Sequence, residues 1–147
     1  MIFDLKHYIY FLISYLICSI PFGLIVGKIF GNIDVRKQGS KNIGATNVSR
    51  LVGKKWGILT FMLDGMKGGT MIIIAKQFSM SYYHSYFLSL VVLFCVLGHI
   101  FPIYLKFKGG KGVATTMFCL LFYSKIIGIC AMIIWLITFV FTRTSSL

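Results

Sequence analysis

Long apolar segments, separated by short polar ones, dominate this chain. Four of them reach the ~20 residues needed to cross a ~30 Å hydrocarbon core, at approximately residues 8–30, 56–75, 86–105 and 113–141. Inside lipid only helices or closed barrels satisfy the backbone, and runs this continuous are helical. The pattern predicts an all-α polytopic transmembrane bundle with about four spanning helices, forming a single integral-membrane domain over residues 1–147.

Two polar interruptions fall inside these segments. Pro21 removes a backbone donor and is expected to kink the first helix, and the carbonyls so freed must meet protein or a cavity. Asp64 and Lys67 are three residues apart and share one helical face, where exposure to lipid would be costly. Two interpretations stay open for them: a structural ion pair, or the polar wall of a substrate cavity.

Composition supports a membrane protein and argues against a nucleic-acid binder. Hydrophobic residues make up 58% of the chain, and 15 Lys and Arg stand against 3 Asp and Glu, for a net charge of +12. A basic nucleic-acid binder needs no segments of membrane-spanning length, so these cations are expected to meet anionic lipid headgroups, phosphorylated substrates, or both.

The four cysteines are predicted to be small buried hydrophobes. Cys18, Cys95, Cys119 and Cys130 all lie in apolar runs, without CxxC spacing or a nearby His. This arrangement predicts neither a disulfide framework nor a zinc site.

The polar connections differ in charge. Residues 31–55 and 106–112 are rich in Lys and Arg, whereas residues 76–85 contain only Lys76. By the positive-inside rule, both basic loops face the cytoplasm. The sequence therefore predicts a multi-pass membrane protein with both loops on one side.

The first basic loop contains GSKNIGATNVSR, residues 39–50. Its glycines permit turns whose free amides form an anion-binding nest, and Ser40, Asn42, Thr46 and Asn47 can donate further hydrogen bonds. We expect Asn47 to cap a helix beginning near Val48. The N-terminus of such a helix would favour phosphate. Arg50 would add a bidentate phosphate contact. The alternative is a cytoplasmic turn carrying ordinary positive-inside cations.

The second basic loop, KFKGGKGVATT, covers residues 106–116 and places Lys111 among glycines before the last apolar segment. A lysine among glycines before a helix is typical of a phosphate-binding loop, although the spacing does not match a Walker A motif. The alternative is a plain Gly- and Lys-rich linker. His99 lies just before this loop, in GHIFP. It is either a structural histidine or a base or phosphate ligand.

Several motifs are missing from the sequence. There is no HxxxxD, no GxSxG elbow and no metal-binding set of acids or histidines. We therefore expect no metal and no cofactor. An enzyme of this composition would act on an already activated substrate, by positioning and charge neutralisation.

Four stretches resemble the bacterial membrane acyl-phosphate:glycerol-3-phosphate acyltransferase (PlsY) family. They are SIPFGLIVGK (19–28), GSKNIGATNVSR (39–50), DGMKGG (64–69) and GHIFPIYLKFKGGKGVAT (98–115). The resemblance implies transfer of a fatty acyl group from acyl phosphate to the 1-hydroxyl of glycerol 3-phosphate, giving lysophosphatidic acid and phosphate. It also implies contact with membrane lipids and with lipid-synthesis enzymes, and a substrate phosphate that helps to deprotonate the attacking hydroxyl.

The resemblance assigns roles to particular residues. Catalytic residues around the acyl phosphate would be Ser40, Asn42, Thr46 and Asn47. Substrate-binding residues would be Gly39, Gly44, Arg50, Gly110, Lys111, Gly112 and Ser146, with Arg50 and Lys111 on the phosphate of glycerol 3-phosphate. His99, Asp64 and Lys67 are further candidates.

The sequence departs from the family at its end. Family members are longer, and Arg143 and Ser146 match the start of a further motif that does not continue here. The expectation is a C-terminally truncated chain with weak or no activity. Two alternatives to an acyltransferase remain: an inactive form or scaffold for lipid-synthesis enzymes, and a small anion transporter.

Overall fold

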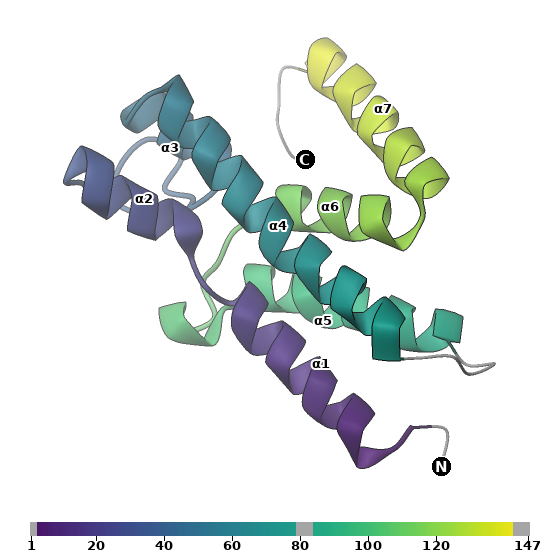
Figure 1. The fold of residues 1–147 in the computed structure, drawn as a ribbon. Coiled ribbons are helices and arrows are strands. Elements are labelled where there is room, and N and C mark those ends of the chain that lie inside the picture. The colour runs from purple at the N-terminus through teal and green to yellow at the C-terminus, as the bar shows by residue number, and fades with distance from the viewer. Residues whose placement is uncertain (1–2, 79–83, 143–147) are drawn as a thin grey trace.

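The computed structural model describes residues 3–78 and 84–142 as helices joined by loops (Figure 1). In chain order these are α1 (Leu5–Cys18), α2 (Phe22–Gly31), α3 (Ala45–Leu51), α4 (Lys54–Phe78), α5 (His84–Ile100), the 3₁₀ turn η1 (Ile103–Leu105), α6 (Val113–Tyr123) and α7 (Lys125–Thr142). The described residues contain no strand, and the predicted all-α class is confirmed.

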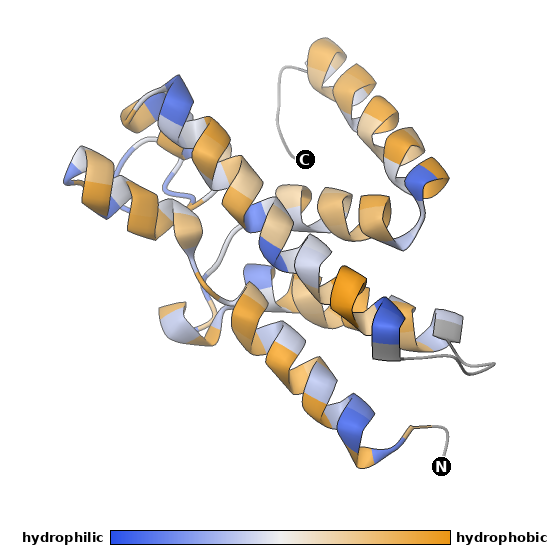
Figure 2. Cartoon of the chain, viewed as in Figure 1, coloured by the Kyte–Doolittle hydropathy of each residue, from blue (hydrophilic) through white to orange (hydrophobic). Residues whose placement is uncertain are grey.

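Four stretches of the described chain are long and apolar enough to cross a membrane. They are Leu5–Gly31, Lys54–Gln77, Ser85–Leu105 and Lys125–Thr142. The predicted number of spans is therefore confirmed. Apolar residues cover α1 and α7, whereas a short polar stretch interrupts the middle of α4 (Figure 2).

Two of the predicted spans, the first and the fourth, are each divided into two helices. Residues 19–21 break the first into α1 and α2, because Pro21 has no N–H to continue the ladder. The predicted fourth span, 113–141, is not one helix: α6 ends at Tyr123 and α7 begins at Lys125. The glycine at 128 lets α7 fold back closely, since a Cβ there would collide with the backbone of Leu121. The 11 residues of α6 extend only about 16 Å, too short to span.

Helix α4 runs through the middle of the molecule and contacts α1, α2, α3, α5 and α6. Its glycines allow α6 to approach closely. A Cβ on Gly68 would lie 2.7 Å from Cys119 Sγ and 2.8 Å from Thr115 Cγ2, and one on Gly65 would meet the ring of Phe118. Small residues at the contact are the usual means by which helices associate in a membrane, where van der Waals packing replaces the hydrophobic effect.

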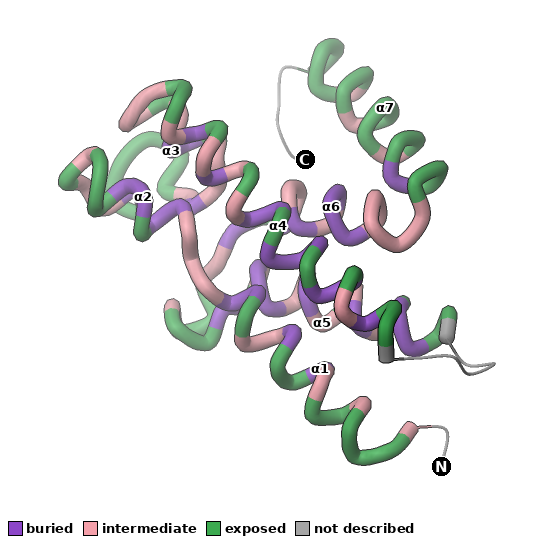
Figure 3. The backbone as a smooth tube through the Cα atoms, viewed as in Figure 1, coloured by how far each residue is buried: buried purple, intermediate pink, exposed green. Residues whose placement is uncertain are grey.

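The cysteine prediction holds for three of the four residues. Cys18, Cys95 and Cys119 are fully buried and free, in one apolar cluster. Cys130 is free but exposed, because α7 is exposed along most of its length (Figure 3). Its apolar surface suits contact with lipid or with further protein.

We expect Gly68→Ala to destabilise the bundle by about 1–3 kcal/mol, because the added methyl group forces α4 and α6 apart. The measurement is the thermal unfolding midpoint in detergent. Met66→Ala on the exposed side of α4 is the control. Equal midpoints for the two variants would contradict the close packing of α4 on α6.

Candidate active site

The first Gly-rich loop is organised by the side chain of Asn47, a buried residue of α3. Its Nδ2 donates to the carbonyls of Val35 (2.9 Å), Gln38 (3.2 Å) and Asn42 (2.9 Å). Its Oδ1 accepts from the backbone N–H of Ser40 at 3.0 Å. One amide therefore joins the start, middle and end of the loop.

The predicted capping role of Asn47 is wrong. Helix α3 begins at Ala45, with Gly44 at the N-cap position and no side-chain cap. Asn47 is thus in the first turn of α3, and its amide donates to carbonyls of the loop that precedes the helix. Asn42 takes the neighbouring position: its Oδ1 accepts from the Gly44 N–H at 2.9 Å.

Two close approaches fix this loop against the rest of the protein. Gly39 has φ +59°, a left-handed conformation that favours glycine, and a Cβ there would collide with Asn47 Oδ1. On the other side, a Cβ on Gly23 of α2 would collide with the carbonyl oxygen of Ile43. Helix α2 therefore lies directly against the loop backbone.

The second Gly-rich loop folds back over the end of α5. The N–H groups of Gly109 and Gly110 donate to the carbonyls of Ile100 and His99, each at 3.1 Å. A Cβ on Gly110 would collide with His99 Nε2, so the backbone rests on the imidazole. Gly112, with φ +79°, is the N-cap of α6.

The polar residues at membrane depth form a buried triad of Asp64, Lys67 and His99. Lys67 Nζ lies 2.8 Å from Asp64 Oδ1 and 2.8 Å from the carbonyl oxygen of Ile20. His99 Nδ1 lies 3.6 Å from the same Asp64 oxygen and makes no hydrogen bond. Asp64 and Lys67 form the ion pair of the first interpretation. Asp64 also lines a cavity, and the second interpretation, a substrate cavity, stays a prediction.

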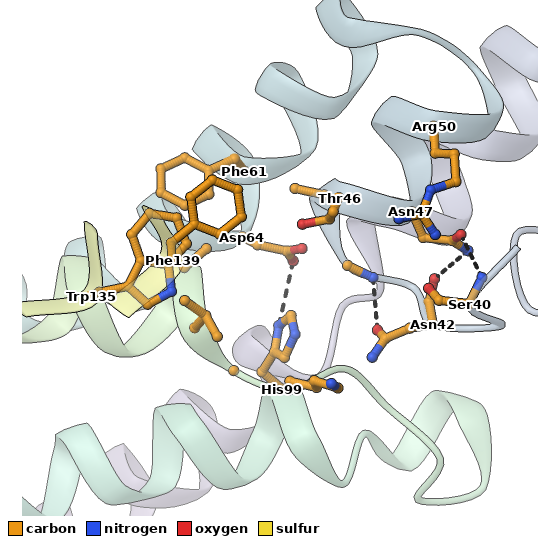
Figure 4. Close-up of a pocket in the computed structure, with 16 residues that line it drawn as sticks. Ser40, Asn42, Thr46, Asn47, Arg50, Phe61, Asp64, His99, Trp135 and Phe139 are labelled. Atoms are coloured by element: carbon orange, nitrogen blue, oxygen red, sulfur yellow. Dashed lines mark hydrogen bonds and ion pairs between the residues drawn. The ribbon is translucent and has the colours of Figure 1, made fainter. Parts of the chain in front are cut away.

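A cavity of about 520 Å³ lies between the two loops and the helices (Figure 4). Its polar end is lined by residues of both loops and of the triad, namely Ser40, Asn42, Gly44, Ala45, Thr46, Asn47, Arg50, Asp64, His99, Lys111 and Gly112. Val113 and Ala114 continue the wall into α6, and Phe61, Trp135 and Phe139 form an aromatic end.

Most of the predicted site residues thus come together around one cavity. Gly39 and Gly110 do not line it but support its walls, and Lys67 lies behind Asp64. Ser146, for which we predicted substrate binding, lies outside the described residues, as does Arg143.

The aromatic end was not predicted from the sequence. Trp135 and Phe139 stack with centroids 5.3 Å apart, and Phe61 packs edge-on against Phe118 at 5.7 Å. Trp135 and Phe139 are four residues apart in α7, which was a signal that their rings share a helical face. Nothing in the local sequence indicated that this face turns toward the loops.

Charge around the cavity is predominantly positive. Arg50 and Lys111 line its polar end, and the negative charge of Asp64 is paired with Lys67. The other acid of this region, Asp34, bonds to the Arg36 guanidinium at 2.7 Å, and that hydrogen bond holds the pKa of Asp34 below its usual range. An anion entering the cavity therefore meets the cations Arg50 and Lys111 at its polar end.

Among the described residues, no three His, Cys, Asp or Glu side chains come together as a metal site. The polar end offers amide, hydroxyl and cationic donors, which are the usual ligands of phosphate, and the other end is aromatic. Fold and site together define an integral membrane protein suited to a ligand with an anionic head and an apolar tail.

Comparison with known proteins identifies the family. Residues 8–147 match the family model of glycerol-3-phosphate acyltransferase, and the chain belongs to that family. The glycerol-3-phosphate acyltransferase of Bartonella quintana is 48% identical over 137 residues, covering 93% of this chain and 65% of the relative. That of Ehrlichia canis is 48% identical over 135 residues, covering 92% of this chain and 69% of the relative.

Solved structures agree with the fold. The crystal structure of PlsY, an integral membrane glycerol 3-phosphate acyltransferase, is similar in its glycerol 3-phosphate form, with a TM-score of 0.84 and 37% identity. Its lysophosphatidic acid form gives a TM-score of 0.82 and 36% identity. Each match covers 95% of this chain and 68% of the other. The chain thus spans about two thirds of the length of its relatives.

Asn47→Asp should loosen the first loop. The substitution keeps the shape but replaces the Nδ2 donor with an oxygen that faces three carbonyls, a loss of about 1–3 kcal/mol. We expect faster tryptic cleavage at Arg36, Lys37 and Lys41, measured by limited proteolysis in detergent. Gln38→Ala, whose side chain is exposed, is the control. Unchanged cleavage of Asn47→Asp would contradict the organising role of the amide.

Proposed function

We propose that this chain transfers a fatty acyl group from acyl phosphate to the 1-hydroxyl of glycerol 3-phosphate. The products are lysophosphatidic acid and inorganic phosphate. The observation that carries the proposal is the cavity, which joins two basic Gly-rich loops to an aromatic end. Its lining suits the two substrates. The polar end would hold their two phosphate groups, and the aromatic end would hold the acyl chain.

The first loop would hold the acyl phosphate. Ser40, Asn42 and Thr46 line the cavity with hydroxyl and amide groups, which can donate hydrogen bonds to the phosphoryl and carbonyl oxygens. Asn47 would act differently from these three, because its amide already holds the loop backbone together. Its contribution would be to keep the loop in its binding shape before substrate arrives.

Arg50 and Lys111 would bind the phosphate of glycerol 3-phosphate. They come from α3 and from the second loop, and both line the cavity. A guanidinium binds phosphate through two parallel N–H groups, and an ammonium adds a point charge. Together they would neutralise a dianion and fix the direction of its hydroxyl.

The reaction needs positioning more than a strong base. The 1-hydroxyl oxygen would attack the acyl carbonyl carbon, forming the ester C–O bond while the bond from that carbon to the phosphate oxygen breaks. Inorganic phosphate leaves, and the hydroxyl proton passes to a phosphate oxygen. Because the acyl phosphate is an activated anhydride, orientation and charge neutralisation are the main contributions asked of the protein.

The aromatic end would receive the acyl chain. Phe61 projects from α4, and Trp135 and Phe139 project from α7. Because α7 is otherwise largely exposed, this end lies near the lipid-facing surface. A long acyl chain could extend from the cavity into the bilayer, where the donor and the product both reside.

Activity should depend on the two cavity cations. With palmitoyl phosphate and labelled glycerol 3-phosphate, membranes that contain the chain should form labelled lysophosphatidic acid. Arg50→Ala and Lys111→Ala should raise the KM for glycerol 3-phosphate roughly 10- to 100-fold, since each removes a hydrogen bond to a charged group. Lys37→Ala, an exposed cation outside the cavity, is the control.

A chain extended by the C-terminal third of the Bartonella quintana relative separates two explanations of a negative assay. Activity only in the extended chain would assign the missing step to that third. No product from either chain would refute the proposal.

We further propose that the protein lies in the bacterial inner membrane with both Gly-rich loops in the cytoplasm. The cations of the two loops support this orientation. In a Cys130→Ser background, Lys37→Cys and Lys108→Cys should react with an impermeant maleimide only after the membrane is opened. Lys76→Cys should react from outside. The reverse pattern would contradict the orientation while leaving the activity untouched.

A further inference from the structure

The proposed chemistry uses no residue of the Asp64–Lys67–His99 triad. All three side chains are at most 4% exposed, in a region where an ionised group is costly unless it is paired. The triad also joins elements that are far apart in the chain. It therefore requires an explanation beyond the stability of one helix.

One arm of the triad reaches the first Gly-rich loop. Lys67 Nζ donates to the carbonyl of Ile20, the last residue before Pro21, at 2.8 Å, and lies 5.6 Å from the centre of the Phe22 ring. This contact holds the start of α2. One residue later, Gly23 lies against the carbonyl of Ile43, so the position of α2 sets the position of the loop.

The other arm reaches both ends of the second Gly-rich loop. Before the loop, His99 Nδ1 lies 3.6 Å from Asp64 Oδ1, and the far edge of the ring supports Gly110. After the loop, Thr115 Oγ1 donates to the backbone carbonyl of Asp64 at 2.8 Å. Asp64 is the residue at which all of these contacts meet.

We propose that Asp64 is a positioning residue that sets the distance between the two Gly-rich loops, acting through Lys67 on the first and through His99 on the second. The loops lead into different helices, and in the described part of the chain no hydrogen bond joins the backbone of one loop to that of the other. Their separation is therefore set by the triad and by the helix packing around it. A cavity that must hold two phosphates requires this separation to be fixed.

The test measures the loop separation directly and needs no ligand. Nitroxide labels at Lys37→Cys and Lys108→Cys, in a Cys130→Ser background, report the separation by pulsed electron–electron double resonance in nanodiscs. The remaining cysteines are buried. Asp64→Asn with Lys67→Met removes both charges, so no buried ion is left unpaired, and the Ile20 carbonyl keeps the backbone N–H of Phe22 as a donor. We expect a folded variant with a somewhat lower thermal midpoint and a shifted or broader distance distribution.

The control is Tyr10→Phe, which removes a 2.6 Å hydrogen bond from α1 to the Met71 carbonyl of α4, away from the cavity. It should leave the distance distribution unchanged. His99→Ala keeps the Asp64–Lys67 pair and should also shift or broaden the distance distribution. It replaces the double variant in the test if the double variant does not fold. A wild-type distribution in the folded double variant, or in His99→Ala in its place, would overturn the proposal.

A kinetic comparison rests on the proposed function and is separate from the distance measurement. Misplaced loops should lower kcat/KM for glycerol 3-phosphate about 100-fold in the folded double variant. Gly110→Ala should lower kcat/KM by a similar factor, because its methyl group collides with the His99 ring. In the His99→Ala background this collision is absent, so adding Gly110→Ala should lower kcat/KM no further. A triad-dependent distance, with no product from either the chain or its C-terminally extended form, would refute the acyltransferase proposal alone.

Discussion

In hydrocarbon, a backbone carbonyl without a hydrogen bond costs several kcal/mol. At the break between α1 and α2, the Ile20 carbonyl accepts from the backbone N–H of Phe22 at 3.1 Å, and Lys67 adds a second donor from the middle of α4 at 2.8 Å. A lysine can remain charged at that depth only beside a counter-ion, which is Asp64. The helix break, the buried pair and the approach of α2 to the first loop therefore depend on one another. Removing one member of the buried pair alone leaves the other charge uncompensated inside the membrane domain.

Close backbone approach is the second condition on which the site depends. Gly65 and Gly68 allow α6 to lie on α4, Gly23 allows α2 to lie on the first loop, and Gly110 allows the second loop to lie on His99. Each contact replaces a side chain with backbone. The glycines thus do more than make the loops adaptable to an anion: they bring the loops to the helices, and so bring both loops to one cavity.

The cavity combines two environments that are seldom adjacent. Loop donors and two cations line one end, and three aromatic rings line the other. A phosphate is held by directional hydrogen bonds and charge, whereas an acyl chain is held by apolar area without direction. The proposed acyl transfer to glycerol 3-phosphate would use both ends, because its substrates would be phosphates that carry or receive an acyl chain.

The all-α membrane class, the number of spans and the position of the two Gly-rich loops could be predicted from the amino-acid sequence, because they depend on the length of apolar runs and on local composition. The division of 113–141 into two helices could not, and neither could the role of Asn47 in tying the loop or the placing of Phe61, Trp135 and Phe139 beside the loops. Only the tertiary structure decided that Asp64 meets His99 as well as Lys67. These outcomes depend on which helix packs against which, and contacts between residues distant in the chain leave no periodic signal in a single sequence.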